Sequence, residues 1–196
     1  MQRLSAFMYF NNIKTKLNKS CMLIQRKILF NNLYDKYAEL LFLLILRYVG
    51  HENDAEEVLQ RGFIKAYNKL SDFKKYNEKA TKGWLSTIMI NESLLYLREK
   101  KRLILFDNSS LSEYSNISTE ENEIELTYEE CLKLVQELPL GYRTVFNLNV
   151  IEGYKHAEIA NILNITESSS RSQLTRARAI LITKIKALRY ETKRIG

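Results

Sequence analysis

The chain has 196 residues, 45% of them hydrophobic, and its 30 Lys and Arg side chains outnumber its 23 Asp and Glu side chains. This length allows one large domain or two small ones. A basic excess is typical of proteins that bind a polyanion, either nucleic acid or a membrane surface, and composition alone does not decide between the two.

The cysteines and the apolar runs exclude several classes of protein. Cys21 and Cys131 lie far apart, and neither has a second cysteine or a histidine at ligand spacing. This argues against a disulfide framework and a zinc site, so we expect no metal, no cofactor and a reducing, cytoplasmic environment. The most apolar run, residues 40–46, is far shorter than the roughly 18 residues of a membrane span. We expect a buried core helix there and no membrane span.

The N-terminal segment is basic. The first 34 residues contain six basic side chains and no acidic one, and they lack the uninterrupted apolar block of a secretory signal. We expect residues 1–22 to be a basic N-terminal arm that is disordered. Alternatively, translation begins at Met22 and residues 1–21 lie upstream of the true start.

One proline and six glycines in the whole chain, with apolar residues at steps of three and four, predict an all-α fold of two small helical domains. In the first, residues 23–102, we expect helices over about 33–49, 53–70 and 83–102. Gly50 is placed to end the first helix. Asn53 or Asp54 is placed to cap the second, with Glu56 or Glu57 as the capping-box partner.

The composition changes after the third predicted helix. Residues 103–130 contain eight acidic side chains and no basic one. A solvated acidic tract of this kind is typical of a linker. We therefore place an acidic linker over residues 103–125, a second domain over residues 126–190 and a basic tail over residues 191–196.

The second domain carries the spacing of a helix-turn-helix over residues 158–166. Ala160 is small where two helices must approach closely. Asn164 stands where the chain requires a left-handed residue, and Thr166 can cap the helix that follows. The sequence therefore predicts a short helix over residues 155–163, a tight turn, and a long final helix from about residue 167.

The two sides of this final helix differ. At about 100° per residue, one side collects the residues expected to pack on the domain, which are Ser170, Leu174, Ala177 and Leu181. The opposite side interleaves short polar groups with arginines, a composition suited to base edges in a major groove. We predict that this helix contacts DNA through Arg171, Ser172, Thr175, Arg176 and Arg178.

Both halves match one family in the same order. In the first half the matching residues are 33–37 (LYDKY), 54–60 (DAEEVLQ), Phe63, Trp84, Leu85, Ile88, Asn91 and 98–102 (REKKR). In the second half they are Leu138, Pro139, Arg143, Val145, Phe146, Glu152, Gly153, 158–160 (EIA), Arg171, Ser172 and 176–178 (RAR). The chain resembles the extracytoplasmic-function sigma factors of bacterial RNA polymerase.

The resemblance implies partners and roles. It implies that the chain binds core RNA polymerase at the β′ clamp and the β flap, recognises promoter DNA, and is held by an anti-sigma factor. It implies no small-molecule substrate and no catalytic residue. The residues implied at the clamp are Asp54, Glu57, Gln60 and Arg61. The final helix is implied to read the −35 element.

For the −10 element, the family uses the loop before the tryptophan helix, here residues 74–82, to capture an unstacked base. Because extruding a base costs free energy, cationic phosphate contacts must offset it. The residues expected on this strand are Lys74, Lys75, Asn77, Lys79, Lys82, Asn91, Arg98, Lys100, Lys101 and Arg102. Trp84 is open to two interpretations, a core residue or a wedge between the strands, and its helical spacing favours the core.

Several positions depart from the family pattern. Arg61 stands where the family has an acid, which reverses the charge of one implied clamp contact. The other departures are Thr81 for an aromatic, Leu95 for Asp, Lys155 for a capping Ser, and Ser170 for a buried Val.

Two other classes of function remain open on the residues alone. A stand-alone helix-turn-helix regulator accounts for the second half and the charge, but it leaves the first domain unexplained. An enzyme requires a convergent site. His51 and His156 are isolated in sequence, and the pair Glu56 and Glu57 is better explained by helix capping. We therefore expect no enzyme.

Overall fold

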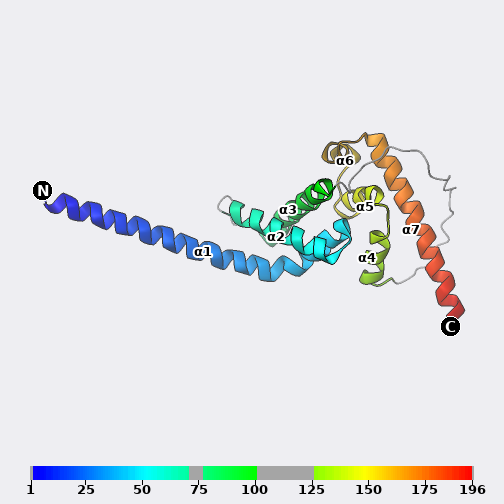
Figure 1. Cartoon of the computed structure of the whole chain (residues 1–196), viewed down its shortest axis with the longest axis horizontal. Helices are drawn as coiled ribbons and strands as arrows, with labels where there is room; N and C mark the ends of the chain where they lie inside the picture. Colours follow the sequence, from blue (N-terminus) through cyan, green and yellow to red (C-terminus); the bar gives the residue numbers. More distant parts are fainter. Residues whose placement is uncertain (1, 71–76, 101–125, 196) are drawn as a thin grey trace.

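The computed structural model describes the backbone of residues 2–70, 77–100 and 126–195, and the side chains of residues 23–70, 77–100 and 126–188. Within these ranges the chain is helical and contains no strand, which confirms the all-α prediction. Figure 1 shows a long first helix leading into a cluster of shorter helices, with the last helix on the far side. Among the residues described, no helix combines the length and the apolar character needed to cross a bilayer.

The first group of helices consists of α1 (Gln2–Val49), α2 (Glu52–Lys69) and α3 (Glu78–Glu99). The predicted start of the first helix near residue 33 is wrong, because α1 begins at Gln2 and includes the backbone of the expected basic arm. The reason is that residues 2–49 contain no glycine or proline, so nothing in the sequence ends the helix. The N-terminal part of α1 extends away from the other helices (Figure 1).

The starts of α2 and α3 also differ from the prediction. Gly50, at φ +86°, ends α1, and His51 alone provides the extended residue before α2, so Asn53 and Asp54 lie inside the helix. Helix α3 begins five residues earlier than expected because the Asn77 side chain accepts a hydrogen bond from the Ala80 amide at 2.9 Å. Lys79 and Lys82 are therefore helical residues, and not part of a loop over residues 74–82.

The core of this group lies where the three helices meet. The fully buried side chains there include Leu41, Ile45, Val58, Leu85 and Met89. Helices α2 and α3 approach closely at Gly62, where an added Cβ would lie 2.1 Å from the Met89 sulfur. A larger residue at position 62 would therefore push the two helices apart or displace Met89.

The second group contains α4 (Tyr128–Gln136), α5 (Leu140–Phe146), the π-helix η1 (Asn147–Ile151), α6 (His156–Leu163) and α7 (Glu167–Ile195). Thr127 and Glu130 form a capping box that begins α4, and Pro139 separates α4 from α5. The π-helix places Asn147 and Leu148 in the interior.

The two groups are in contact. Apolar residues of the second group belong to the same continuous cluster of buried side chains as the core of α1–α3, and they are Val145, Leu148, Ile159, Leu163 and Leu174. The C-terminal end of α1 lies against α4 and α5. The structure therefore places the helix-turn-helix directly beside the first group.

Candidate nucleic-acid interface

The turn between α6 and α7 has the geometry of a helix-turn-helix. Asn164 adopts the left-handed conformation, with φ 55° and ψ 50°, and ends α6. The Thr166 hydroxyl accepts a hydrogen bond from the Ser169 amide at 3.0 Å and so caps α7. Ala160 is buried where the two helices approach. These three predictions from the sequence are confirmed.

The exposed side of α7 carries the residues predicted to contact DNA. Arg171, Ser172, Thr175 and Arg178 are exposed and Arg176 is half-buried, while Ser170, Leu174 and Ala177 are buried on the opposite side. Arg171 pairs with Glu167 at 2.9 Å one turn earlier, with a side chain that remains 59% exposed. Guanidinium and hydroxyl groups on one open helix face can donate to base edges and phosphates.

His156 supports this helix in a way that the sequence analysis missed. Its Nδ1 lies 2.8 Å from the Ser170 hydroxyl, and Ser170 has no exposed surface. A buried hydroxyl requires a hydrogen-bond partner, so His156 explains how a serine is accommodated at this buried position.

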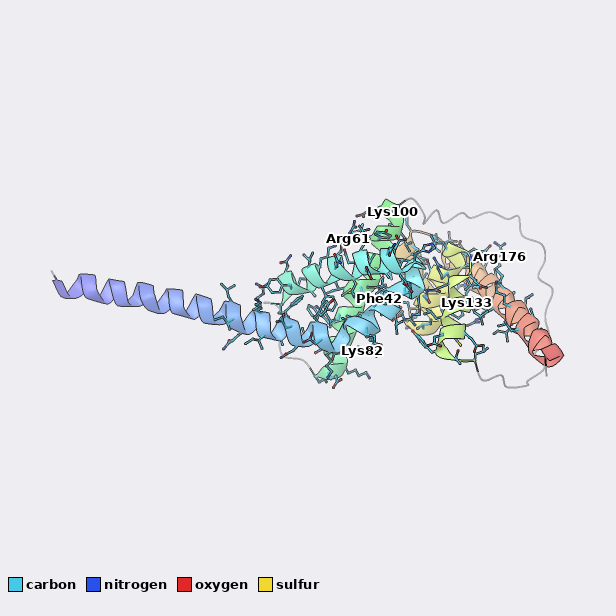
Figure 2. The ribbon with its side chains drawn as sticks, turned by 60° about the horizontal axis from the view of Figure 1, so that its bottom comes forward. Phe42, Arg61, Lys82, Lys100, Lys133 and Arg176 are labelled. Atoms are coloured by element: carbon cyan, nitrogen blue, oxygen red, sulfur yellow. The ribbon has the colours of Figure 1, made fainter. Side chains whose placement is uncertain are left out.

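Helix α3 brings some of the predicted strand contacts together and separates others. Asn91 and Arg98 are exposed and seven residues apart, so they share one face. Trp84 lies on the same face, partly buried against the core, as the core interpretation predicted. Lys82 and Lys100 are exposed at opposite ends of α3 and on its other side, as the labelled side chains in Figure 2 also show for the two ends.

Several of these residues already have partners. The Asn77 side chain caps α3, and Lys100 lies over the Tyr96 ring, with its ammonium 5.3 Å from the centroid. Lys79 is exposed. The Arg98 guanidinium donates a hydrogen bond to the Ile162 carbonyl of α6. Lys74, Lys75, Lys101 and Arg102 lie outside the described residues.

The four residues predicted at the polymerase clamp fall on two sides of α2. Asp54 accepts a hydrogen bond from the Tyr96 hydroxyl at 2.7 Å. Arg61 pairs with Glu57 at 2.6 Å and with Glu99 at 2.7 Å, so its reversed charge is balanced within the protein. Asp54, Glu57 and Arg61 therefore lie on the side of α2 that is nearer to α3. Gln60 is exposed on the other side of α2.

Gln60 borders a pocket of about 320 Å³ between α1 and α2. Leu59 and Phe42 contribute apolar surface, and Glu39 and Glu56 are exposed at its edge. The sequence analysis missed Glu39 and Phe42 here. The four-residue spacing in the sequence places Glu56 beside Gln60 on one face of α2. That Glu39 and Phe42 of α1 lie next to them depends on the packing of α1 on α2, which only the structure shows.

In the part of the chain that the structure describes, no group of three or more His, Cys, Asp or Glu side chains is placed to hold a metal ion. Cys131 is exposed and free. The arrangement offers hydrogen-bond donors, cations and an acidic-rimmed apolar pocket, which are binding groups.

Comparison with known proteins agrees with this geometry. The family described as Sigma-70 region 2 matches residues 33–103, and the family described as Sigma-70, region 4 matches residues 128–181. The chain is 30% identical over 170 residues to the ECF RNA polymerase sigma-E factor of Haemophilus influenzae, covering 81% of this chain and 88% of that protein. It is 28% identical to the ECF RNA polymerase sigma factor SigW of Bacillus subtilis, covering 81% of this chain and 90% of that protein. A solved structure, the sigma factor RpoE in complex with the anti-sigma factor NepR from Bartonella quintana, is similar at 21% identity and a TM-score of 0.48, covering 80% of this chain and 96% of that one.

Proposed function

This chain belongs to the extracytoplasmic-function (ECF) sigma factors, and we propose that its two helical halves divide promoter recognition between them. As a member of this family it is a sigma factor that directs transcription initiation by bacterial RNA polymerase. In our proposal residues 23–102 are the region 2 domain, residues 103–125 an acidic linker and residues 126–190 the region 4 domain. Residues 1–22 and 191–196 are basic extensions.

The observation that carries the proposal is the donor-rich exposed face of α7 on a well-formed helix-turn-helix. Arg171, Ser172, Thr175 and Arg178 are exposed in the first turns of α7, with half-buried Arg176 among them. A recognition helix contacts base edges with its N-terminal residues when it lies in the major groove. We propose that this face reads the −35 element, and that Arg176 makes a base contact there.

The proposed contacts to the −10 element lie on α3. Asn91 and Arg98 form one exposed face, with the partly buried Trp84 and the exposed Leu95 beside them. Cations that bind phosphates, next to apolar groups on which bases stack, are the combination that holds single strands. We propose that this face holds the strand, and that Lys82 and Lys100 add phosphate contacts at the two ends of the helix.

The pocket beside Gln60 is the proposed polymerase contact. Its apolar surface from Phe42 and Leu59, edged by Glu39 and Glu56, suits a basic amphipathic segment, and we propose that the β′ clamp supplies this segment. Asp54 and Arg61 hold α2 against α3 through Tyr96 and Glu99, and Glu57 pairs with Arg61 within α2, so together they position this surface. The proposal also includes the β flap and an anti-sigma factor as partners, and action in the cytoplasm, where the polymerase works.

In-vitro transcription tests this proposal. The purified chain, added to core RNA polymerase over a library of promoter templates, should start transcripts from a defined subset. Arg176→Ala should change that subset, whereas Lys133→Ala, an equal loss of charge at an exposed position of α4, should not. Failure to associate with core polymerase, or association without any transcript, would contradict the proposal.

The alternative, a stand-alone regulator, predicts a different result in a simpler assay. Such a protein binds its duplex site unaided, typically as a dimer. We expect only weak, salt-sensitive and sequence-independent duplex binding until core polymerase is added. Tight, sequence-specific binding of the isolated chain would favour the regulator.

A further inference from the structure

The first residue of α7 is acidic, and it lies on the side of the helix that carries the predicted DNA contacts. Glu167 begins an exposed stripe along the helix, in which the next members follow at steps of four, four and three residues, and they are Arg171, Thr175 and Arg178. Residues 167–190 contain six basic residues and Glu167 as their one acidic residue. A carboxylate therefore stands at the start of a face that is otherwise suited to a polyanion.

A carboxylate at this place has two opposite effects. In the first turn of a helix it is favourable, because the backbone N–H groups there carry a partial positive charge. Beside DNA it is unfavourable, because the phosphates repel it. The Thr166 hydroxyl already caps α7 by accepting a hydrogen bond from the Ser169 amide. The start of the helix therefore has another determinant, and helix stability alone does not account for an acid on this face.

Glu167 and Arg171 form a pair on this face. The Arg171 Nη2 donates to the Glu167 Oε2 at 2.9 Å, and the Arg171 and Glu167 side chains remain 59% and 46% exposed. A guanidinium has several N–H donors and a carboxylate has several lone-pair sites. One hydrogen bond between them leaves both groups able to bind a further partner. The pair thus presents donors and an acceptor side by side on the open side of α7.

The hydroxyl groups nearby are bonded to the helix itself. The Ser172 hydroxyl donates to the Ser169 carbonyl at 3.0 Å, and the Thr175 hydroxyl donates to the Arg171 carbonyl at 3.1 Å. A hydroxyl has a single hydrogen to donate, so in this arrangement both hydroxyls present only lone pairs to a ligand. The donors that the first turns of α7 offer to a base are then those of the Arg171 guanidinium, and Glu167 fixes where that guanidinium lies.

A G·C base pair presents the complement of this arrangement in the major groove. Guanine offers the acceptors N7 and O6, and the paired cytosine offers its N4 amino group as a donor. A guanidinium can donate to both guanine acceptors, and a carboxylate can accept from cytosine N4. Adenine has an amino donor where guanine has O6, so an A·T pair would set a donor against the guanidinium. The paired side chains therefore match G·C and reject A·T.

We propose that Glu167 and Arg171 read one G·C pair of the −35 element as a unit, with Arg171 on the guanine and Glu167 on the cytosine. This rests on the proposed function, which assigns the exposed face of α7 to the −35 element. A recognition helix contacts base edges with its N-terminal residues, and Glu167 is the first residue of α7. The hydrogen bond to cytosine and the fixed position of Arg171 then offset the repulsion between Glu167 and the phosphates.

An acid that only begins the helix predicts the opposite effect of a substitution. Without a base contact, Glu167→Ala removes a charge that repels phosphate, and affinity rises by a similar factor on every DNA sequence. With a contact to cytosine, Glu167→Ala lowers affinity for the preferred sequence and relaxes the choice of base at one position. The two interpretations therefore differ in sign on the preferred promoter.

Promoter selection measures this choice. The full chain in complex with core polymerase transcribes a library of templates whose −35 region is randomised, and the transcribed templates are sequenced. Wild type should require a G·C pair at one position. Glu167→Ala and Arg171→Ala should each reduce the preference at that same position by about tenfold. Because the two side chains act as a unit, the double variant should lose little more than Arg171→Ala alone.

Two further variants separate base reading from charge. Arg171→Lys keeps the positive charge but not the planar fork of donors, so it should relax the preference as Arg171→Ala does. Full recovery of wild-type behaviour by lysine would identify a phosphate contact and overturn the inference. The matched control Glu129→Ala removes an exposed acid from the first turn of α4 and should leave the preference unchanged. Far-ultraviolet circular dichroism of each variant checks that the helices are intact.

Failure of the inference and failure of the proposed function give different results. The free chain also selects from the same library as duplex DNA, so that base preference is measured even if no transcript starts. Absence of transcription with wild type contradicts the proposed function. The inference is overturned if wild type prefers no G·C pair in either selection, or if Glu167→Ala raises affinity uniformly. Relaxation at different positions in Glu167→Ala and Arg171→Ala would also overturn it.

Discussion

The imidazole of His156 lies 2.8 Å from the hydroxyl of Ser170, which is completely buried between α6 and α7. This hydrogen bond links the first residue of α6 to the buried side of α7. It therefore contributes to the angle at which α7 leaves the domain, and so to the position of the residues proposed to read DNA.

Removing one partner should be more harmful than removing both. His156→Ala leaves the Ser170 hydroxyl buried without a partner and should lower the free energy of unfolding by about 1–3 kcal/mol. Ser170→Val in the His156→Ala background should recover most of that loss, because no buried polar group remains. Urea unfolding of the single variants and the double variant measures this. Additive losses would show that the two side chains are not coupled.

Arg176 should determine sequence choice. If it contacts a base, Arg176→Ala should weaken promoter binding by about 1–3 kcal/mol and relax preference at one position of the −35 element. The measurement is the affinity of the polymerase complex for a panel of single-base variants of one promoter, with Lys133→Ala as the control. An equal loss on every promoter would instead identify a phosphate contact.

The turn of the helix-turn-helix and the faces of α7 could be predicted because their determinants are local. The left-handed conformation of Asn164, the Thr166 cap and the burial of Leu174 and Ala177 depend on residues within one or two turns. The family resemblance, which covers both halves in order, was sufficient for the sigma factor assignment.

The remaining features depend on contacts between distant elements. Arg61 is a reversed charge in the sequence. Glu57 lies one turn earlier on the same helix, but only the packing of α2 on α3 shows that Glu99 balances the charge as well. Asn147 finds its partner 100 residues away. The predicted helix starts lie later in the chain than the observed ones. The prediction relied on glycine and proline as helix breaks, whereas an observed start such as that of α3 depends on the Asn77 cap.

Gln60 and Arg61 are neighbours with different predicted roles. Gln60→Ala should weaken binding to core polymerase and leave stability within about 0.5 kcal/mol of wild type, because the side chain is exposed at the pocket edge. Affinity measured by titration of core polymerase, with Asn68→Ala as an exposed control on α2, checks this. Unchanged affinity would remove Gln60 from the proposed contact.

Arg61→Ala should act mainly on stability. It removes two partly exposed ion pairs, one with Glu57 within α2 and one with Glu99 that connects α2 to α3. Because exposed pairs contribute little each, we expect a loss of about 0.5–1 kcal/mol in the free energy of unfolding. High salt should reduce the difference from wild type by screening these pairs. A large loss of polymerase affinity with unchanged stability would instead make Arg61 a direct contact.

The free energy of unfolding should depend on pH through Glu152, which pairs with Arg47 at 2.9 Å where α1 meets η1. Burial raises the pKa of this carboxyl above its ordinary value of 4.5, while Arg47 and, more weakly, Lys82 act in the opposite direction. Tyr48 also faces the site, and burial chiefly, then the Glu152 charge, raises its pKa. Glu152 binds a proton more tightly in the folded protein than in the unfolded chain, so protonation stabilises the folded form.

This contribution is fully present below the ordinary pKa of 4.5 and is lost as the pH rises through the raised value. Raising the pH from 4.5 to neutrality should therefore lower the contribution of Glu152 to the free energy of unfolding, measured by urea unfolding of wild type and of Glu152→Gln at each pH. Glu152→Gln should lack this part of the pH dependence. Lys184→Glu, which breaks the pair between Lys184 and Glu137, should keep it. If wild type instead gains stability relative to Glu152→Gln as the pH rises, the ion pair with Arg47 outweighs the burial of Glu152.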